Sequence, residues 1–330
     1  MDENRLRVVF MGTPEFAATC LETLLDGRHK VVGVVTAPDR ESGRGRKISC
    51  SAVKKLAIDR GLPIEQPVLL RDVGFLERLR EWNADLGVVV AFRMLPEVVW
   101  NMPKMGTVNL HGSLLPQFRG AAPIQRAIMA GASESGATTF LLSHSIDTGD
   151  VLGRVKLDIH ENENAGSLHD RILEAGKKLL ASTIDNIADG TVNAKPQSSL
   201  AEGTEDDLLE APKLFKEDRI INWNSPTAVI HNLIRGLSPY PGAITYLPSE
   251  VGASKIKGDA PIKILESSLS EKTGLVPGEI STEGDKLIVG TKDGAIEIAR
   301  IQPSGKSAMK IQDYLRGIRT PITSFVSLNI

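Results

Sequence analysis

Three short apolar runs, rich in β-branched residues, constrain the fold of this chain more than any other feature of its sequence. They do not alternate between apolar and polar residues, as a strand with one face in water would. The runs are LRVVFM (6–11), KVVGVVTAP (30–38) and DLGVVVAF (85–92), and segments with helical spacing lie between them at 15–26, 51–60 and 75–82. This pattern predicts a parallel sheet that is covered by helices on both faces.

The following segments extend this sheet as far as residue 190. TVNLHG (107–112) indicates a further strand, and APIQRAIMAG indicates a helix that ends at Gly131. ATTFLLSHS and VLGRVKLDIH predict two strands paired antiparallel across the turn IDTGD (146–150), before an amphipathic helix at 167–189. We therefore predict an α/β domain at 1–190 with a doubly wound, mostly parallel sheet.

Beyond residue 190 the sequence changes character. Residues 191–210 are polar and lack periodicity, which is typical of a linker. A helix is predicted at 225–236, with Ser225 as its N-cap and Pro226 at its first helical position. Short strands then recur between turn signals, which favours a small closed β-barrel at 211–330.

Charge and cysteine content narrow the functional class. Residues 1–210 carry 24 basic and 29 acidic side chains, whereas residues 211–330 carry 15 and 12, so the second part suits an anionic partner. Cys20 and Cys50 match no zinc spacing and no disulfide framework. The start of the chain does not resemble a signal peptide, and no run approaches the roughly 20 apolar residues that span a bilayer. We expect a cytosolic protein with no membrane partner.

The segment VNLHGSLLPQFRGAAP (108–123) holds the first candidate for catalysis. Asn109 and His111 are two positions apart at the end of a predicted strand, so they would share one face. An amide and an imidazole there could stabilise an oxyanion that develops during acyl transfer. The alternative is a hydrogen-bonded pair that only caps the strand, and the motif alone does not decide between them.

Asp147, in the turn IDTGD, is the second candidate. It could orient His111, favour its protonated form and relay protons from an attacking amine. It could equally be an Asx-turn residue, because Asp is common in turns that contain Gly. The 36 positions between the two residues leave their contact open.

A basic stretch, PDRESGRGRK (38–47), is the third feature. Six basic residues and only two acidic ones fall between positions 39 and 55, and two glycines favour a flexible loop. Such a loop could bind the phosphates of an RNA, or it could be a solvated surface loop.

Several signatures are absent from the sequence. GTPEF lacks the second and third glycines of a dinucleotide fingerprint, which argues against a nicotinamide cofactor. There is no GxxxxGK[ST], no GxSxG and no His/Cys cluster, so we expect no metal site.

These residues together resemble the methionyl-tRNA formyltransferase family. The resemblance is carried by GTPEFA, PDRESGRGRK, VNLHGSLLPQFRGAAPIQRAI, IDTGD, IINWNSPTAVIHNLIRGLSPYPGA and IQPSGKSAM, in order from residue 12 to residue 309. It implies a barrel like an OB fold at the C-terminus. It also implies direct transfer of a formyl group from N10-formyltetrahydrofolate to the α-amine of methionine on initiator methionyl-tRNA, for translation initiation.

The resemblance also assigns residues to the site. Asn109, His111 and Asp147 match the catalytic residues of the family. The folate-binding positions are Ser113, Leu114, Leu115, Pro116, Val90, Phe92 and Met94, and the tRNA and methionine positions are Arg44, Arg46, Lys47 and Phe16. The family has a Tyr-Gly pair and one more residue where this chain has Phe92 to Leu95, so the folate contacts of this loop differ.

Three other functions remain open from the sequence. One is a formyl-folate hydrolase domain, which normally belongs to a much longer chain. A formyltransferase for an amino sugar would share the catalytic domain, but it would need neither the basic loop nor the barrel. A non-catalytic RNA-binding protein would use the loop and the barrel, but it would leave Asn109, His111 and Asp147 unexplained. We expect a monomer.

Overall fold

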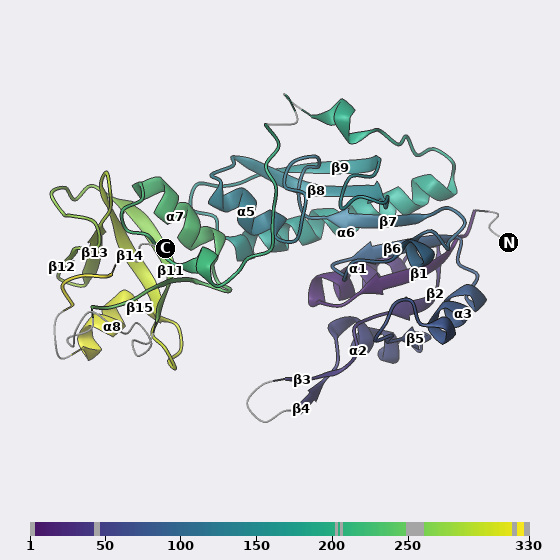
Figure 1. Cartoon of the computed structure of the whole chain (residues 1–330), viewed down its shortest axis with the longest axis horizontal. Coiled ribbons are helices and arrows are strands. Elements are labelled where there is room, and N and C mark those ends of the chain that lie inside the picture. The colour runs from purple at the N-terminus through teal and green to yellow at the C-terminus, as the bar shows by residue number, and fades with distance from the viewer. Residues whose placement is uncertain are drawn as a thin grey trace. The chain divides into compact units, whose positions relative to one another are not determined.

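A computed structural model describes residues 4–42, 47–201, 204, 207–248, 261–318 and 322–326 of the chain. Its contacts divide the chain into two compact units (Figure 1). The N-terminal unit comprises Met1–Gly120, Ser135–Leu157 and Asp170–Glu210, and the C-terminal unit comprises Ala121–Glu134, Asp158–His169 and Ala211–Ile330. The predicted domain limits at 1–190 and 211–330 divide the chain into continuous segments, unlike these units. They stay a prediction.

The N-terminal unit is built on one seven-stranded sheet, which confirms the predicted doubly wound α/β fold. Its strand order is β5-β2-β1-β6-β7-β8-β9, with parallel pairing from β5 to β7 and antiparallel pairing between β7 and β8. The strands are β1 (Arg7–Gly12), β2 (Lys30–Val35), β5 (Ile64–Glu65), β6 (Leu86–Val90), β7 (Thr107–His111), β8 (Glu134–Leu141) and β9 (Val151–Asp158). β6 is buried along its whole length, as its continuous apolar run predicts.

The helices of this region are α1 (Glu15–Leu25), α2 (Ala52–Asp59), α3 (Val73–Glu81), α4 (Glu97–Trp100) and the long α6 (Ala165–Ala188). Local chemistry starts α2 and α3, because the side chains of Ser51 and Asp72 accept hydrogen bonds from backbone amides in the first turn. Phe75 and Leu79 of α3 pack in one cluster with Val9 of β1. A helix face is thus buried against the sheet, as the helical spacing predicts.

The chain reverses its direction across the sheet between β1 and β6. From β1 it proceeds to β2 and β5 on one side, and it then returns to β6 and β7 on the other. Ligands bind at such a switch point, outside the carboxyl ends of the strands. β1 ends there at Gly12. Only glycine fits at this position, because an added Cβ would lie 2.6 Å from the Cβ of Ala17 and 2.9 Å from the carbonyl oxygen of Val90.

The C-terminal unit contains a barrel-like antiparallel sheet, as predicted. Its order is β10-β11-β14-β13-β12, and β15 also pairs with β14. Residues 323–326 close it: Phe325 donates its amide to Gly278, before β12, while Val326 donates to Tyr246, after β10. The elements are β10 (Ala243–Thr245), β11 (Ile262–Ser270), β12 (Ile280–Glu283), β13 (Lys286–Gly290), β14 (Ala295–Gln302), β15 (Met309–Lys310), α5 (Pro123–Met129), α7 (Thr227–Gly236) and α8 (Ile311–Gly317).

The start of α7 corrects one prediction. The helix begins at Thr227, and its N-cap is Pro226, so Ser225 is not the cap. Instead, Asp293 accepts hydrogen bonds from the Thr227 amide at 2.7 Å and from its hydroxyl at 2.8 Å. These bonds hold the pKa of Asp293 below its usual range. A carboxylate from the β13–β14 turn therefore replaces the local cap, and a tertiary contact of this kind has no signal in the sequence around residue 225.

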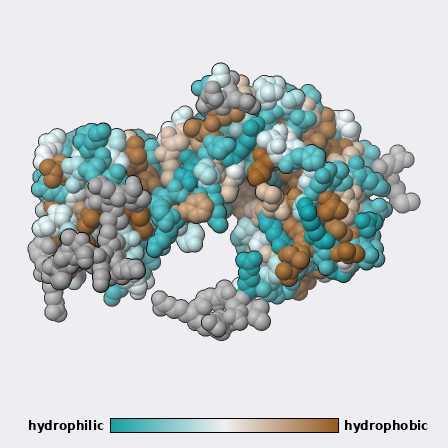
Figure 2. All heavy atoms as spheres, in the orientation of Figure 1, coloured by the Kyte–Doolittle hydropathy of each residue, from teal (hydrophilic) through white to brown (hydrophobic). Residues whose placement is uncertain are grey.

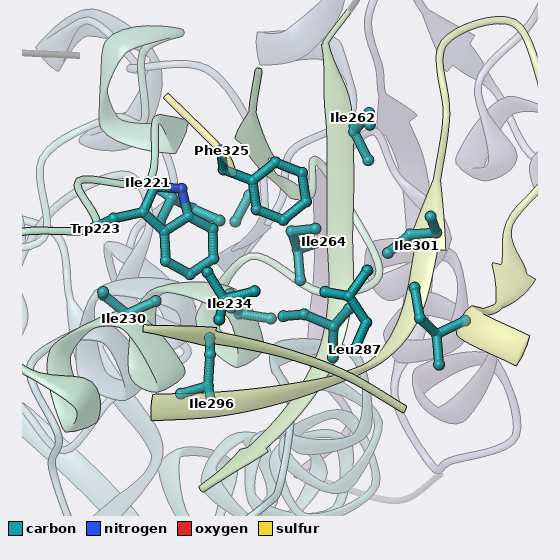
Figure 3. Close-up of a cluster of buried hydrophobic side chains, with 14 of the residues drawn as sticks. Ile221, Trp223, Ile230, Ile234, Ile262, Ile264, Leu287, Ile296, Ile301 and Phe325 are labelled. Atoms are coloured by element: carbon teal, nitrogen blue, oxygen red, sulfur yellow. The ribbon is translucent and has the colours of Figure 1, made fainter. Parts of the chain in front are cut away.

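The core of the C-terminal unit is an apolar cluster that includes one tryptophan, Trp223 (Figure 3). Trp223 is fully buried, and its ring stacks on that of Phe325 with centroids 5.5 Å apart. Its indole N–H donates to the Thr245 hydroxyl at 3.0 Å. Branched aliphatic side chains from α7 and the strands surround it, including Ile230, Ile234, Ile264, Leu287 and Ile296.

The surface has mixed polarity. In the view of Figure 2, hydrophilic and hydrophobic residues are interspersed over the described parts of both units. Among the described residues, no helix has both the length and the apolar character to span a membrane.

Candidate active site at the carboxyl end of β7

Asn109 and His111 lie on one face at the end of β7, as their spacing predicts. Asn109 is paired in register with Val89 of β6, and His111 with Thr138 of β8. Val89 packs against α3 and α4, so the two polar side chains share the face of the sheet that carries these helices. Asn109 is half-buried, and none of the described residues hydrogen-bonds its side-chain amide. Its two N–H donors are therefore available to a ligand.

The imidazole of His111 is held between two protein groups. Its Nε2 lies 2.9 Å from the carbonyl oxygen of Phe118, and its Nδ1 lies 3.8 Å from Oδ2 of Asp147. A carbonyl oxygen only accepts hydrogen bonds, so Nε2 must carry a proton and donate it. Nδ1, on the side of the carboxylate, is therefore the ring nitrogen that remains for other interactions.

The turn between β8 and β9 brings Asp147 to this histidine across the 36 positions that separate them. Oδ2 of Asp147 also accepts a hydrogen bond from the Gly120 amide at 3.0 Å. The backbone of Asp147 is left-handed, with φ +53°. The tight turn also requires Gly149, because an added Cβ would lie 1.6 Å from the carbonyl oxygen of Leu141. His111 and Asp147 thus lie side by side, on the face of β7 that also carries Asn109.

The loop after β7 is rigid and mostly buried. The Ser113 hydroxyl donates to the Gln117 carbonyl at 2.6 Å, and Thr138 accepts from the Leu115 amide at 3.1 Å. Thr138 also donates to the Ser113 carbonyl at 2.7 Å. Ser113 and Leu115 are fully buried and Pro116 is buried, whereas Leu114 is half-buried. Of the four predicted folate positions in this loop, Leu114 has the most accessible side chain.

The segment after β6 forms the adjoining wall. Val90 is fully buried, Phe92 is half-buried and Met94 is 72% exposed. Arg93 does not extend freely into solvent, because its guanidinium donates to the carbonyl oxygens of Pro67 and Val68. Partial burial lowers the pKa of Arg93. Arg93 therefore ties the segment after β6 to residues 67 and 68.

The positions expected to bind methionine and tRNA are only partly described. Phe16 is half-buried in the first turn of α1, next to the end of β1. Arg44 and Arg46 lie outside the described residues. Lys47 begins β4 (Lys47–Ser49), which pairs antiparallel with β3 (Arg40–Ser42). The basic segment therefore includes a hairpin whose strands flank residues 43–46.

Sequence reasoning did not identify three polar residues that support this site. Thr138 fixes the loop after β7, and Arg119 donates to the side-chain oxygen of Gln197 at 2.7 and 2.9 Å. Gln197 in turn donates to the carbonyl oxygen of Asp147 at 2.8 Å. Gln197 lies in the polar segment 191–210, where nothing in the sequence distinguishes it from its exposed neighbours. No group of three or more His, Cys, Asp or Glu side chains that could hold a metal occurs in the described part of the chain.

Comparisons with known proteins identify the family of the chain. Residues 5–184 match the formyl transferase family, and residues 213–319 match the formyl transferase C-terminal domain. A methionyl-tRNA formyltransferase from Bacteroides thetaiotaomicron is 47% identical over 321 residues, which cover 97% of this chain and 98% of the relative. One from Bacteroides fragilis is 46% identical over 319 residues, 96% of each chain.

A solved structure shows the same fold at low identity. HypX from Aquifex aeolicus, in complex with tetrahydrofolic acid, has a TM-score of 0.61 and 18% identity. The match covers 94% of this chain and 47% of that one. The family match spans most of the N-terminal sheet, and the high identity extends over nearly the whole chain. This chain therefore belongs to the formyl transferase family.

Proposed function

We propose that this protein transfers a formyl group from N10-formyltetrahydrofolate to the α-amine of methionine on initiator methionyl-tRNA, the step that prepares this tRNA for translation initiation. The observation that carries the proposal is the approach of Asp147 to His111 at the carboxyl end of β7, on the face of the strand that also carries Asn109. The names of relatives at 46–47% identity support the choice of tRNA as acceptor.

The segments around the site fit a folate. When bound, N10-formyltetrahydrofolate supplies the activated formyl carbon. Apolar side chains on the segments after two neighbouring strands would form the walls of its site: Phe92 and Met94 after β6, and Leu114 after β7. Flat aromatic ligands favour pockets of this kind, with a few polar groups that fix their orientation. We assign Val90, Ser113, Leu115 and Pro116 to the support of these walls, because their side chains are buried.

The residues of the site act on the charges that develop as the amine attacks. A new C–N bond forms at the formyl carbon, the carbonyl oxygen becomes an oxyanion, and the amine becomes an ammonium. Asn109 donates to the oxyanion, and a single donor of this type contributes about 3–4 kcal/mol. His111, protonated on Nδ1, adds positive charge beside it, and Asp147 stabilises that form.

The second half of the reaction needs a proton transfer. The ammonium must lose a proton and N10 must gain one before the C–N10 bond breaks and tetrahydrofolate leaves. Oδ2 of Asp147 would take the proton that the ammonium loses, and protonated Nδ1 of His111 would give one to N10, after which the proton on Asp147 returns to His111. All three side chains come from the N-terminal unit of a single chain, so we propose that the enzyme acts as a monomer. We place the reaction in the cytoplasm, where translation begins.

The acceptor is tested by a transfer assay with labelled N10-formyltetrahydrofolate. Methionyl initiator tRNA, free methionine and a nucleotide-linked amino sugar are compared at equal concentration. We expect label on the methionyl-tRNA alone. Label on the amino sugar would overturn the proposed acceptor but keep the formyl transfer, whereas no transfer to any acceptor would overturn both.

A further inference from the structure

Gln197 is a buried amide whose hydrogen-bonding groups are all used. Gln197 is only 4% exposed, although the segment around it is polar. Nε2 donates to the carbonyl oxygens of Asp147 at 2.8 Å and Gly149 at 2.9 Å. Oε1 accepts from Nη2 of Arg119 at 2.7 Å and from Nε at 2.9 Å. An amide has two N–H donors and an oxygen with two lone pairs, so these four bonds satisfy it completely.

The two segments that Gln197 joins are the ones that contact His111. Arg119 lies between Phe118, whose carbonyl oxygen accepts from Nε2 of His111, and Gly120, whose amide donates to Asp147. The other segment is the turn that carries Asp147. A closed set of hydrogen bonds therefore links Gln197 to both neighbours of the imidazole, and Gln197 itself does not contact the catalytic face.

Both segments contain backbone that needs such support. Asp147 has φ +53° and Phe118 has φ +59°, and neither is a glycine. Residues other than glycine rarely adopt left-handed backbone, and they keep it only where their surroundings determine it strongly. The two carbonyl bonds of Gln197, one on each side of Thr148, hold the turn in this conformation.

We propose that Gln197 and Arg119 form a brace that positions Asp147 against His111 for formyl transfer, an inference that rests on the proposed function. Both are positioning residues, because they act through the turn and the loop. A segment expected to be a linker thereby supplies part of the support of the active site. If Gln197 only anchored this segment to the N-terminal unit, its loss would reduce stability and leave the catalytic step intact.

The variant Gln197→Glu separates these two roles. A carboxylate of the same length keeps its bonds to the Arg119 guanidinium and strengthens them by its charge. It cannot donate to the carbonyl oxygens of Asp147 and Gly149, and it places negative charge beside them. We expect kcat to fall about 10²-fold, because small misplacements of catalytic groups have effects of this size. The KM for each substrate should stay within about twofold, because no binding contact changes.

A second measurement needs no substrate. The Gly120 amide donates to Asp147, so its hydrogen exchange reports whether that carboxylate stays in place. We expect faster exchange at Gly120 in Gln197→Glu and unchanged exchange in β7. Because this readout does not depend on catalysis, it tests the brace even if the wild-type protein fails to formylate methionyl-tRNA. That failure would overturn the proposed function alone.

A matched control is Gln302→Glu in the C-terminal unit. Nε2 of Gln302 also donates to a backbone carbonyl, that of Lys306 at 3.0 Å. The control therefore makes the same amide-to-carboxylate change at a residue outside the N-terminal unit. The brace is contradicted if kcat of Gln197→Glu stays within about threefold of this control, or if Gly120 exchange is unchanged. Should Gln197→Glu not fold, Arg119→Lys provides the test. The single ammonium of lysine cannot reproduce the two hydrogen bonds that Arg119 donates to Gln197. We expect a smaller loss of kcat, about tenfold, and faster hydrogen exchange at Gly120.

Discussion

The active-site region of the N-terminal unit and the core of the C-terminal unit use buried space in opposite ways. Around β7, buried positions hold polar side chains, including His111, Ser113, Thr138 and Gln197. Around Trp223, the buried side chains are mainly apolar, with the Thr245 hydroxyl as the acceptor for the indole N–H. Polar groups in an interior must be hydrogen-bonded and so fix geometry, whereas apolar side chains contribute through burial and close packing. Changes to the catalytic side chains of β7 should therefore mainly affect rate, and changes near Trp223 should mainly affect stability.

The largest effect on stability should come from Trp223→Ala. The variant removes a fully buried ring that stacks on Phe325 and donates to Thr245. We expect a loss of about 3–5 kcal/mol in the free energy of unfolding of the C-terminal unit, the usual cost of truncating a buried tryptophan. Urea unfolding followed by circular dichroism measures it. Tyr240→Ala is the control, because Tyr240 is an aromatic residue of the same unit that is 78% exposed. A loss no greater than that of the control would show that the core tolerates the cavity.

Asn109→Ala should have the converse effect, a large loss of rate with little change in stability. The half-buried amide has no hydrogen-bond partner among the described residues, so its removal leaves no protein group unpaired. We expect kcat to fall about 10²- to 10³-fold, the range for loss of one oxyanion donor. Steady-state formyl transfer measures the effect, with the exposed Asn193→Ala as control. Near-normal turnover in both Asn109→Ala and Asp147→Asn would refute the catalytic assignment.

The same contrast explains how much of the fold could be predicted from the sequence. Continuous apolar runs such as Leu86–Val90 predict buried parallel strands, because burial on both faces leaves no alternation. The barrel strands are also visible between turn signals. The cap at Ser225 was predicted wrongly, because the carboxylate that satisfies α7 comes from Asp293, 66 positions away. Contacts between residues so far apart along the chain depend on the tertiary fold, and local sequence patterns do not predict them.

The site could be predicted only as far as its contacts are local. The spacing of Asn109 and His111 places them on one face, and the structure has them there. The approach of Asp147 to His111, and the support from Gln197, join positions 36 and 86 residues from His111 along the chain. Family resemblance pointed to Asp147, but neither pattern nor resemblance pointed to Gln197. A residue that acts through another leaves no motif of its own.

A smaller effect on stability should come from Thr138→Val, within the N-terminal unit. Valine has nearly the same shape but cannot accept from the Leu115 amide or donate to the Ser113 carbonyl. A buried amide left unpaired typically costs about 1–3 kcal/mol. We expect a loss of that size in urea unfolding, with a change in KM for the folate because the loop after β7 loses its anchor. Thr282→Val, on an exposed part of β12, is the control. Unchanged stability and KM would show that the loop is held without Thr138.

The smallest effect should be a pH dependence that His29 adds to the stability of the N-terminal unit. His29 is 8% exposed, its Nδ1 accepts from the Leu6 amide at 3.2 Å, and its Nε2 lies 3.1 Å from Oδ1 of Asp185. Burial lowers the pKa of His29, and this outweighs the opposite effect of Asp185. A histidine with a lowered folded-state pKa contributes its full stability above its unfolded pKa of about 6.5, and the contribution is lost as the pH falls from there through the lower folded-state pKa. In His29→Asn, the side-chain oxygen can still accept from Leu6 but does not titrate, so unfolding free energies at pH 7.5 and pH 5 should differ less than in the wild type. The exposed His144→Asn is the control, and an equal pH dependence in both variants would show that His29 does not titrate on unfolding.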